Sequence, residues 1–260
     1  MAAQEDSKSL SQERYTRYGQ AYVGSQTHAK GAELERFVTT SQPEPDWQAL
    51  DVATGGGHTA LKFAPHVREV TATDLTNKMV QVARDFITGQ GIDNVEFLQV
   101  DAENLPFNGE SFDLVTCRIA AHHFPRPDRF VLESVRALKP GGKLLVQDQI
   151  VPEDREAAAR INTFERIRDP SHHRTLSQGE WLALFHQNGL SVYHHEHFIK
   201  KHNFLNWAEM QGCSPKTIQV LIELLAQAPL EVKDWLQPEG MGSPEATFVN
   251  HHTLIAGKKP

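Results

Sequence analysis

Acidic residues at the ends of short apolar runs are the side chains of this sequence best placed for chemistry. Asp51, Asp74 and Asp101 each lie in or directly after such a run, and the glycines of residues 55–57 follow the first. Consecutive glycines let a ligand approach the backbone closely, and a helix that begins behind them offers unpaired N–H groups. A carboxylate at a strand end can accept two hydrogen bonds from a ribose diol. The pattern indicates a site for a nucleotide-like ligand.

The segments around these residues alternate between strand and helix patterns. Strands are predicted at 50–53, 69–73, 95–100, 112–117, 143–148, 190–200 and 247–257. Helices are predicted at 28–40, 59–64, 77–90, 128–137, 152–168, 177–189 and 204–236, the last interrupted at Gly212, with a turn at 138–142. Helices between strands favour parallel pairing. The predicted fold class is α/β, a doubly wound, mostly parallel seven-stranded sheet with a helical insertion or lid between its last two strands.

Composition excludes several classes of function. The 260 residues are 39% hydrophobic and 23% charged, as in ordinary soluble domains. The net charge of −7 and the lack of a Lys/Arg block disfavour a nucleic-acid partner. No apolar run approaches the ~18 residues of a membrane span. Two cysteines and a polar N-terminus indicate a cytoplasmic protein.

Two families fit the glycine-rich turn. Residues 55–60 match the G-x-G-x-x-G/A fingerprint of dinucleotide-binding folds, and Asp74 fits that role as well. The series Asp51, Gly55, Gly57 is also similar to the first motif of class I S-adenosylmethionine-dependent methyltransferases, with Ala53 where a glycine is usual. The alternative to a methyltransferase is therefore an NAD(P)-dependent oxidoreductase. Asp101-Ala102 and the Leu-Lys-Pro-Gly-Gly segment at 138–142 favour the methyltransferase.

Residues 47–150 resemble the cofactor half of these methyltransferases, in the small-molecule branch that includes the ubiquinone/menaquinone biosynthesis methyltransferases. The resemblance implies S-adenosylmethionine as cofactor. Asp51 would reach its methionyl amino group, Asp74 its ribose, and Asp101 its adenine amine. The stretch that contains Tyr15, Tyr18 and Tyr22, which would share one face of a helix, resembles the segment that closes over the cofactor in these enzymes. The predicted cofactor-binding residues are Asp51, Ala53, Gly55, Gly57, Asp74, Leu75, Asp101, Ala102, Arg118 and Tyr22.

Methyl transfer from a sulfonium needs alignment and a dry site, and a general base only for some acceptors. The candidate catalytic residues are His123, His122, Asp148 and His172. For His123 the alternative is a backbone hydrogen bond that shapes the loop. For His172 it is a solvated loop. His195 and His197 would share a strand face, but without a clear third ligand no metal site is predicted.

We expect residues 1–46 to form an N-terminal helical cap and residues 47–150 the S-adenosylmethionine-binding core. Residues 151–260 would supply the acceptor-side helices and the last two strands of the same domain. The apolar faces of Phe164/Ile167, Trp181/Phe185 and Phe204/Trp207 suggest a small apolar or aromatic acceptor. A non-catalytic cofactor-binding protein is a further alternative. The acceptor atom, and the choice between monomer and homodimer, stay open.

Overall fold

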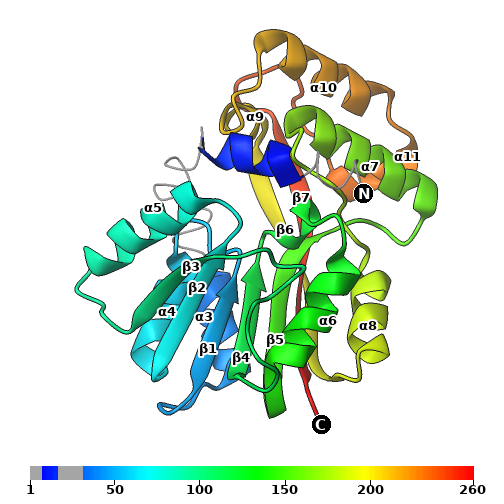
Figure 1. Cartoon of the computed structure of the whole chain (residues 1–260). Coiled ribbons are helices and arrows are strands. Elements are labelled where there is room, and N and C mark those ends of the chain that lie inside the picture. Colours follow the sequence, from blue (N-terminus) through cyan, green and yellow to red (C-terminus); the bar gives the residue numbers. More distant parts are fainter. Residues whose placement is uncertain (1–7, 17–31) are drawn as a thin grey trace.

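The computed structural model describes residues 8–16 and 32–260. Seven strands form one sheet in the order β3-β2-β1-β4-β5-β7-β6 (Figure 1), in which β7 runs antiparallel to both of its neighbours and the other pairs are parallel. The strands are β1 (Gln48–Val52), β2 (Glu69–Asp74), β3 (Val95–Gln99), β4 (Phe112–Arg118), β5 (Leu138–Ile150), β6 (Ser191–Asn203) and β7 (Thr247–Lys258). The predicted α/β class and the mostly parallel seven-stranded sheet are confirmed.

Helices cover both faces of the sheet. The helices α3 (Ala32–Ser41), α4 (His58–Phe63) and α5 (Asn77–Thr88) pack on one face, and α6 (Pro127–Ala137) and α8 (Gln178–Gln187) pack on the other. Successive strand residues point to opposite faces. Leu114 therefore belongs to the hydrophobic core under α3, α4 and α5, and Val115 belongs to the core under α6 and α8. Both cores are needed because a parallel sheet buries both of its faces.

A third core lies beyond the carboxyl ends of the strands. It is formed by α7 (Arg155–Arg168), α9 (Phe204–Glu209), α10 (Pro215–Gln227) and α11 (Leu230–Leu236), with Phe164, Leu221 and Phe248 among its buried members. The helices α9 to α11 lie between β6 and β7 in the chain, which confirms the predicted insertion. Figure 1 places them above the sheet, with the helical residues 8–16 crossing the same edge beneath them.

Two predicted boundaries are wrong, and a third lies partly outside the described residues. The segment 138–142 is the start of β5, where the β4–β5 register is irregular, rather than a separate turn. The helix expected over 204–236 breaks at Ala228 as well as near Gly212, because the residue before Pro229 is pushed out of the helical region. Of the helix expected over 28–40, residues 32–40 lie in α3, and 28–31 fall outside the described residues.

A capping box at Ser177 begins α8. Its hydroxyl accepts from the Glu180 N–H, and the Glu180 carboxylate accepts from the Ser177 N–H at 2.8 Å. Of the helices that the structure describes, none has both the length and the apolar character needed to cross a membrane.

Candidate functional site

The turn between β1 and α4 is built from left-handed backbone. Ala53, Gly55 and Gly57 have φ values of 54°, 55° and 86°. A Cβ on Gly57 would lie 2.9 Å from Ile87 Cδ1, so this glycine lets α4 begin directly against α5. The left-handed conformation of Ala53 explains the glycine preference at this position in the family that the sequence resembles, because Cβ is strained there.

Asp74 closes β2 and holds this turn. Its carboxylate accepts from the Gly55 N–H at 3.1 Å and from the Thr76 N–H at 3.0 Å. Burial raises the pKa of Asp74 to about 6. The side chain still lines a cavity at the carboxyl edge of the sheet, so it is both fixed by backbone donors and accessible to a ligand.

Asp51 lies behind the turn. Its two carboxylate oxygens accept from the hydroxyls of Thr54 at 2.7 Å and Thr116 at 2.8 Å, and only 2% of the residue is exposed. Burial raises the pKa of Asp51 to about 6. Neither Asp51 nor Gly57 lines the cavity. Asp51 therefore shapes the turn from below, and its contact with a ligand stays a prediction.

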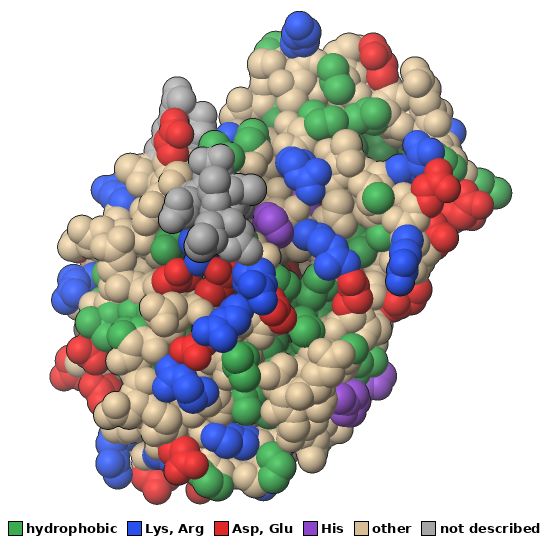
Figure 2. All heavy atoms as spheres, turned by 45° about the vertical axis from the view of Figure 1, so that its right-hand side comes forward, with side chains coloured by type: hydrophobic (Ala, Val, Ile, Leu, Met, Phe, Trp, Pro, Cys, Tyr) green, Lys and Arg blue, Asp and Glu red, His purple; other side chains and the backbone are tan. Residues whose placement is uncertain are grey.

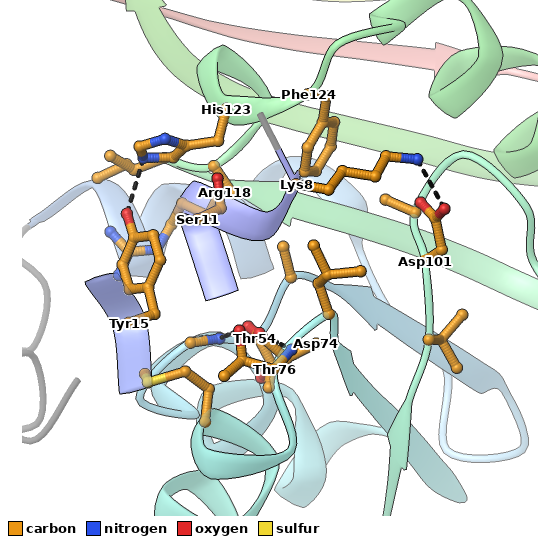
Figure 3. A pocket seen from close by; sticks show the side chains of 18 of the residues that line it. Lys8, Ser11, Tyr15, Thr54, Asp74, Thr76, Asp101, Arg118, His123 and Phe124 are labelled. Carbon is orange, nitrogen blue, oxygen red and sulfur yellow. Dashed lines mark hydrogen bonds and ion pairs between the residues drawn. The ribbon is translucent and has the colours of Figure 1, made fainter. Parts of the chain in front are cut away.

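The first cavity has a volume of about 120 Å³ (Figure 3). Most of the residues predicted to bind a cofactor surround it. These are Ala53, Gly55, Asp74, Leu75, Asp101, Ala102 and Arg118. Tyr22 and Tyr18 lie outside the described residues. The cavity is also lined by Thr76 and Met79 after β2 and by Lys8 and Ser11, which the sequence analysis missed. Thr76 could have been predicted as a lining residue because it closely follows the end of a predicted strand. Nothing in the sequence around Lys8 indicates that it lies at the cavity.

The helical residues 8–16 close the cavity from above. The Lys8 ammonium lies 2.7 Å from the Asp101 carboxylate and 2.6 Å from that of Glu103. At the other end of the segment, Tyr15 contacts His123, as Figure 3 shows. Tyr15 lines the cavity, and residues 8–16 join the predicted adenine side of the cavity to its opposite end. A cap role for Tyr15 over the cofactor stays a prediction.

Arg118 and Ile119 form the floor where β4 ends. The Arg118 Nε donates to the Thr59 hydroxyl at 3.2 Å, and burial lowers the pKa of Arg118. Ile119 has a φ of 55°, which is strained for a β-branched residue, and its N–H donates to the Gln147 carbonyl at 2.7 Å. Strained backbone of this kind is typical of functional sites.

A second cavity, of about 270 Å³, adjoins the first. Tyr15, Ile119 and His123 line both cavities. Beyond them the second cavity is bounded by residues from the end of α7, from α9, and from the upper parts of β6 and β7. A ligand in the first cavity and another in the second would therefore meet at these three side chains.

His123 is held in one tautomer at this junction. Its Nδ1 lies 3.0 Å from the Ser171 carbonyl, which can only accept, so Nδ1 carries the proton. Nε2 is then the acceptor for the Tyr15 hydroxyl at 2.7 Å. Burial and the neighbouring His122 lower the pKa of His123 to about 4. The ring is neutral near pH 7 and presents a lone pair to the junction.

His122 lies beside His123 and lines the second cavity. Its Nδ1 donates to Asp148 at 2.7 Å, and its backbone N–H donates to the same carboxylate at 2.9 Å. Burial alone would lower the pKa of His122, but the Asp148 carboxylate raises it overall. Asp148 is 1% exposed and lines neither cavity, so it positions His122.

His172 lies apart from both cavities, against the sequence hypothesis of a catalytic role. It is 4% exposed, and its Nε2 contacts the Asn162 side-chain oxygen at 2.8 Å. The alternative of a solvated loop is also wrong, because the N–H groups of His173 and Arg174 donate to the His122 carbonyl. The loop after α7 therefore packs behind the histidine pair and supports it.

His195 and His197, which were considered as metal ligands, make hydrogen bonds with other side chains. The Nε2 of His197 lies 2.7 Å from Nδ1 of His251, and His195 contacts Gln178. Within residues 8–16 and 32–260, no group of three or more His, Cys, Asp or Glu side chains is arranged to hold a metal ion.

Comparison with known proteins agrees with this geometry. A family model described as a methyltransferase domain matches residues 50–146. The uncharacterized methyltransferase YcgJ of Bacillus subtilis is 36% identical over 220 residues, which cover 85% of this chain and 87% of that protein. A crystal structure of a candidate methyltransferase from Bacillus halodurans matches with a TM-score of 0.84 and 37% identity, over 88% of this chain and 100% of that one. A ubiquinone/menaquinone biosynthesis C-methyltransferase of Ectopseudomonas mendocina is 35% identical over 135 residues, or 50% of this chain and 53% of that protein.

Proposed function

We propose that this chain, which belongs to the class I S-adenosylmethionine-dependent methyltransferases, transfers the cofactor's methyl group to a small molecule bound in the second cavity. The family membership decides against the oxidoreductase alternative. The cofactor is S-adenosylmethionine, and solved structures of the same fold hold its demethylated product. The observation that carries the proposal is the shared boundary of the two cavities at Tyr15, Ile119 and His123.

In the first cavity, the cofactor's ribose would lie at Asp74 and its adenine beside Asp101 and Ala102. The carboxylate of Asp74 is preorganised for this role by two backbone donors. The methionine part would then lie along Ala53 and Gly55 toward Arg118. This orientation directs the methyl group to the junction between the cavities, and the acceptor atom would attack in line with the leaving sulfur.

His123 is our candidate for the residue that removes a proton from the acceptor, where the acceptor carries one. Its neutral Nε2 faces the junction and is free to accept whenever Tyr15 yields its hydrogen bond. The low pKa makes it a weak base, which suits an acceptor that becomes acidic only as the new bond forms. We assign His122 and Asp148 to positioning His123, and we give His172 no catalytic role.

The apolar acceptor expected from the sequence has little support in the second cavity. Of the six side chains on which that expectation rested, Trp207 lines this cavity. Phe164, Trp181, Phe185 and Phe204 are at most 4% exposed and belong to the hydrophobic cores. We therefore propose a small-molecule acceptor without assigning its polarity from these residues.

Calorimetric titration with S-adenosylmethionine, S-adenosylhomocysteine, NAD and NADP tests the cofactor assignment. We expect micromolar binding of the first two alone. Asp74→Asn should weaken that binding by about 1–3 kcal/mol because a charged acceptor of hydrogen bonds is lost. The matched control is Asp85→Asn on α5, an exposed carboxylate that accepts from Gln81. Equal affinities for the two variants would contradict the role of Asp74.

Turnover is tested separately, by release of S-adenosylhomocysteine in a screen of small-molecule acceptors. Release that depends on one acceptor class supports the proposal. Tight cofactor binding with no release across the screen would favour the non-catalytic alternative.

A further inference from the structure

The lining of the second cavity is cationic and polar. Among the residues that the structure describes, it contains three Lys or Arg residues and four histidines but a single acidic residue, Asp169. The Asp169 carboxylate is already paired with Arg14 at 3.0 Å. The chain as a whole carries a net charge of −7, and on the face in Figure 2 Lys and Arg side chains stand among Asp and Glu side chains. Lys200 and Lys201 pair with Glu33 and Glu239, so Arg168 is the cation of this lining that has no carboxylate partner among the described residues.

Arg168, at the end of α7, is a fixed cation in this lining. Its guanidinium stacks over the Trp207 ring at 4.4 Å, and its Nε and Nη2 donate to the Trp207 carbonyl at 3.0 and 2.9 Å. Among the described residues, no carboxylate lies within 4 Å of this guanidinium. A planar guanidinium held in place by one edge leaves its other donors for an anion.

Lys200 and His202 approach the cavity from β6. They lie opposite Asn250 and Phe248 of β7, so the side chains of alternate residues on both strands project from one face of this ribbon. The Lys200 side chain is 11% exposed, and its ammonium pairs with Glu33 at 3.1 Å. Burial, with Lys200 and Arg168 adding to it, lowers the pKa of His202 to about 4. The direction of these charge effects agrees with a positive potential in the cavity.

Three buried polar atoms in the lining have no hydrogen-bond partner within the described part of the chain. They are Nε2 of His202, Nδ1 of His252 and Oδ1 of Asn250. His252 and Asn250 are 3% and 5% exposed. Buried polar atoms in folded proteins nearly always find a partner. Neutral imidazole rings can turn an N–H toward an anion, and the amide oxygen can accept from a hydroxyl or amine on the same ligand.

We infer that the acceptor bound in the second cavity carries an anionic group, a carboxylate or a phosphate, held by Arg168, Lys200 and His202. The identification of this ligand as the acceptor rests on the proposed function. The anion site itself rests on the charges and unpaired atoms of the cavity.

The test is calorimetric titration of the whole protein with benzoate, phenyl phosphate and the neutral analogue benzyl alcohol, with and without saturating S-adenosylhomocysteine. We expect one of the two anions to bind at least tenfold more tightly than benzyl alcohol. Which one binds distinguishes a carboxylate site from a phosphate site. Arg168→Gln should weaken anion binding at least tenfold, and Arg168→Lys should restore most of it.

The matched control is Arg166→Gln on the same helix, where an exposed guanidinium donates to the His173 carbonyl outside the cavity. It should bind both anions like the unaltered protein. His202→Gln is a second test that keeps the contacts of Arg168 with Trp207, and it should weaken anion binding by about three- to tenfold. Equal affinity for benzyl alcohol and the anions would overturn the inference, as would anion binding that is unchanged in both Arg168→Gln and His202→Gln.

The two proposals fail separately. Anion binding without any binding of S-adenosylhomocysteine would contradict the proposed function and leave the anion site standing. Binding of S-adenosylhomocysteine with no preference for anions would contradict the anion site and leave the proposed function standing.

Discussion

The ammonium group of Lys8 lies 2.7 Å from the carboxylate of Asp101, the side chain that the sequence predicted to receive the adenine amine of the cofactor. The Asp101 Oδ2 accepts from Lys8 and its Oδ1 accepts from the Glu103 N–H at 3.0 Å, so an adenine amine would compete with Lys8 for this carboxylate. The Lys8 and Asp101 side chains are 26% and 34% exposed, so solvent screens the pair. Cofactor binding should therefore displace Lys8 at a modest free-energy cost.

Lys8→Gln is expected to tighten the binding of S-adenosylhomocysteine by up to about fivefold, because an ion pair of this exposure is worth at most about 1 kcal/mol. Calorimetry at two salt concentrations measures the effect, and the gain should shrink at the higher one. Weaker binding by the variant would show instead that Lys8 contacts the bound cofactor.

His123→Gln should lower kcat by about 100-fold or more if its Nε2 accepts the proton of the acceptor. The dissociation constant for S-adenosylhomocysteine should change less than threefold. His66→Gln, on the exposed end of η1 (Ala64–His66), is the control and should keep full activity. An unchanged kcat in His123→Gln would assign His123 to loop packing through Ser171.

The pH profile gives an independent check on the same residue. Because the pKa of His123 is lowered to about 4, the ring stays neutral from pH 6 to pH 8, and kcat should not fall through loss of this base in that range. The loss should come only as the pH approaches 4 to 5. A fall in kcat centred near pH 6.5 that is absent from His123→Gln would contradict a buried, neutral His123.

Ala53→Gly is expected to stabilise the protein. A left-handed alanine costs about 1–2 kcal/mol, whereas glycine loses about 0.4–1 kcal/mol through the greater entropy of the unfolded chain. The net gain in the free energy of unfolding should be about 0.5–1 kcal/mol, measured by urea denaturation. A destabilised variant would show that the Ala53 side chain makes contacts that outweigh the backbone strain.

Asp51→Asn tests the burial of the carboxylate behind the turn. Its pKa is raised to about 6 in the folded protein from an ordinary 3.8, so the folded state binds this proton more tightly than the unfolded state. Its contribution to stability is present below pH 3.8 and is lost as the pH rises to about 6. Relative to the unaltered protein, Asp51→Asn should gain about 2 kcal/mol between pH 4.5 and pH 7.5. Parallel stability curves for the two proteins would show that Asp51 is solvated.

Local sequence patterns specify the fold class and most of the residues that line the first cavity. Asp74 and Arg118 end β2 and β4, and Asp101 lies two residues after β3, so all three lie at the edge where the carboxyl ends of parallel strands meet. The Ser-x-x-Glu spacing of Ser177 and Glu180 likewise specifies a capping box, whose two hydrogen bonds lie within one helical turn. These features depend on local order, which the chain alone specifies.

Tertiary structure decided everything that depends on which distant segments pack together. His123 and His172 look alike in the sequence, yet His123 lines both cavities and His172 is buried against Asn162. The second cavity joins α7, α9, β6 and β7, so its cationic lining has no signature in any one segment. Strand and helix periods give the face on which a side chain lies, but burial and hydrogen-bond partners are set by the neighbours that the fold supplies.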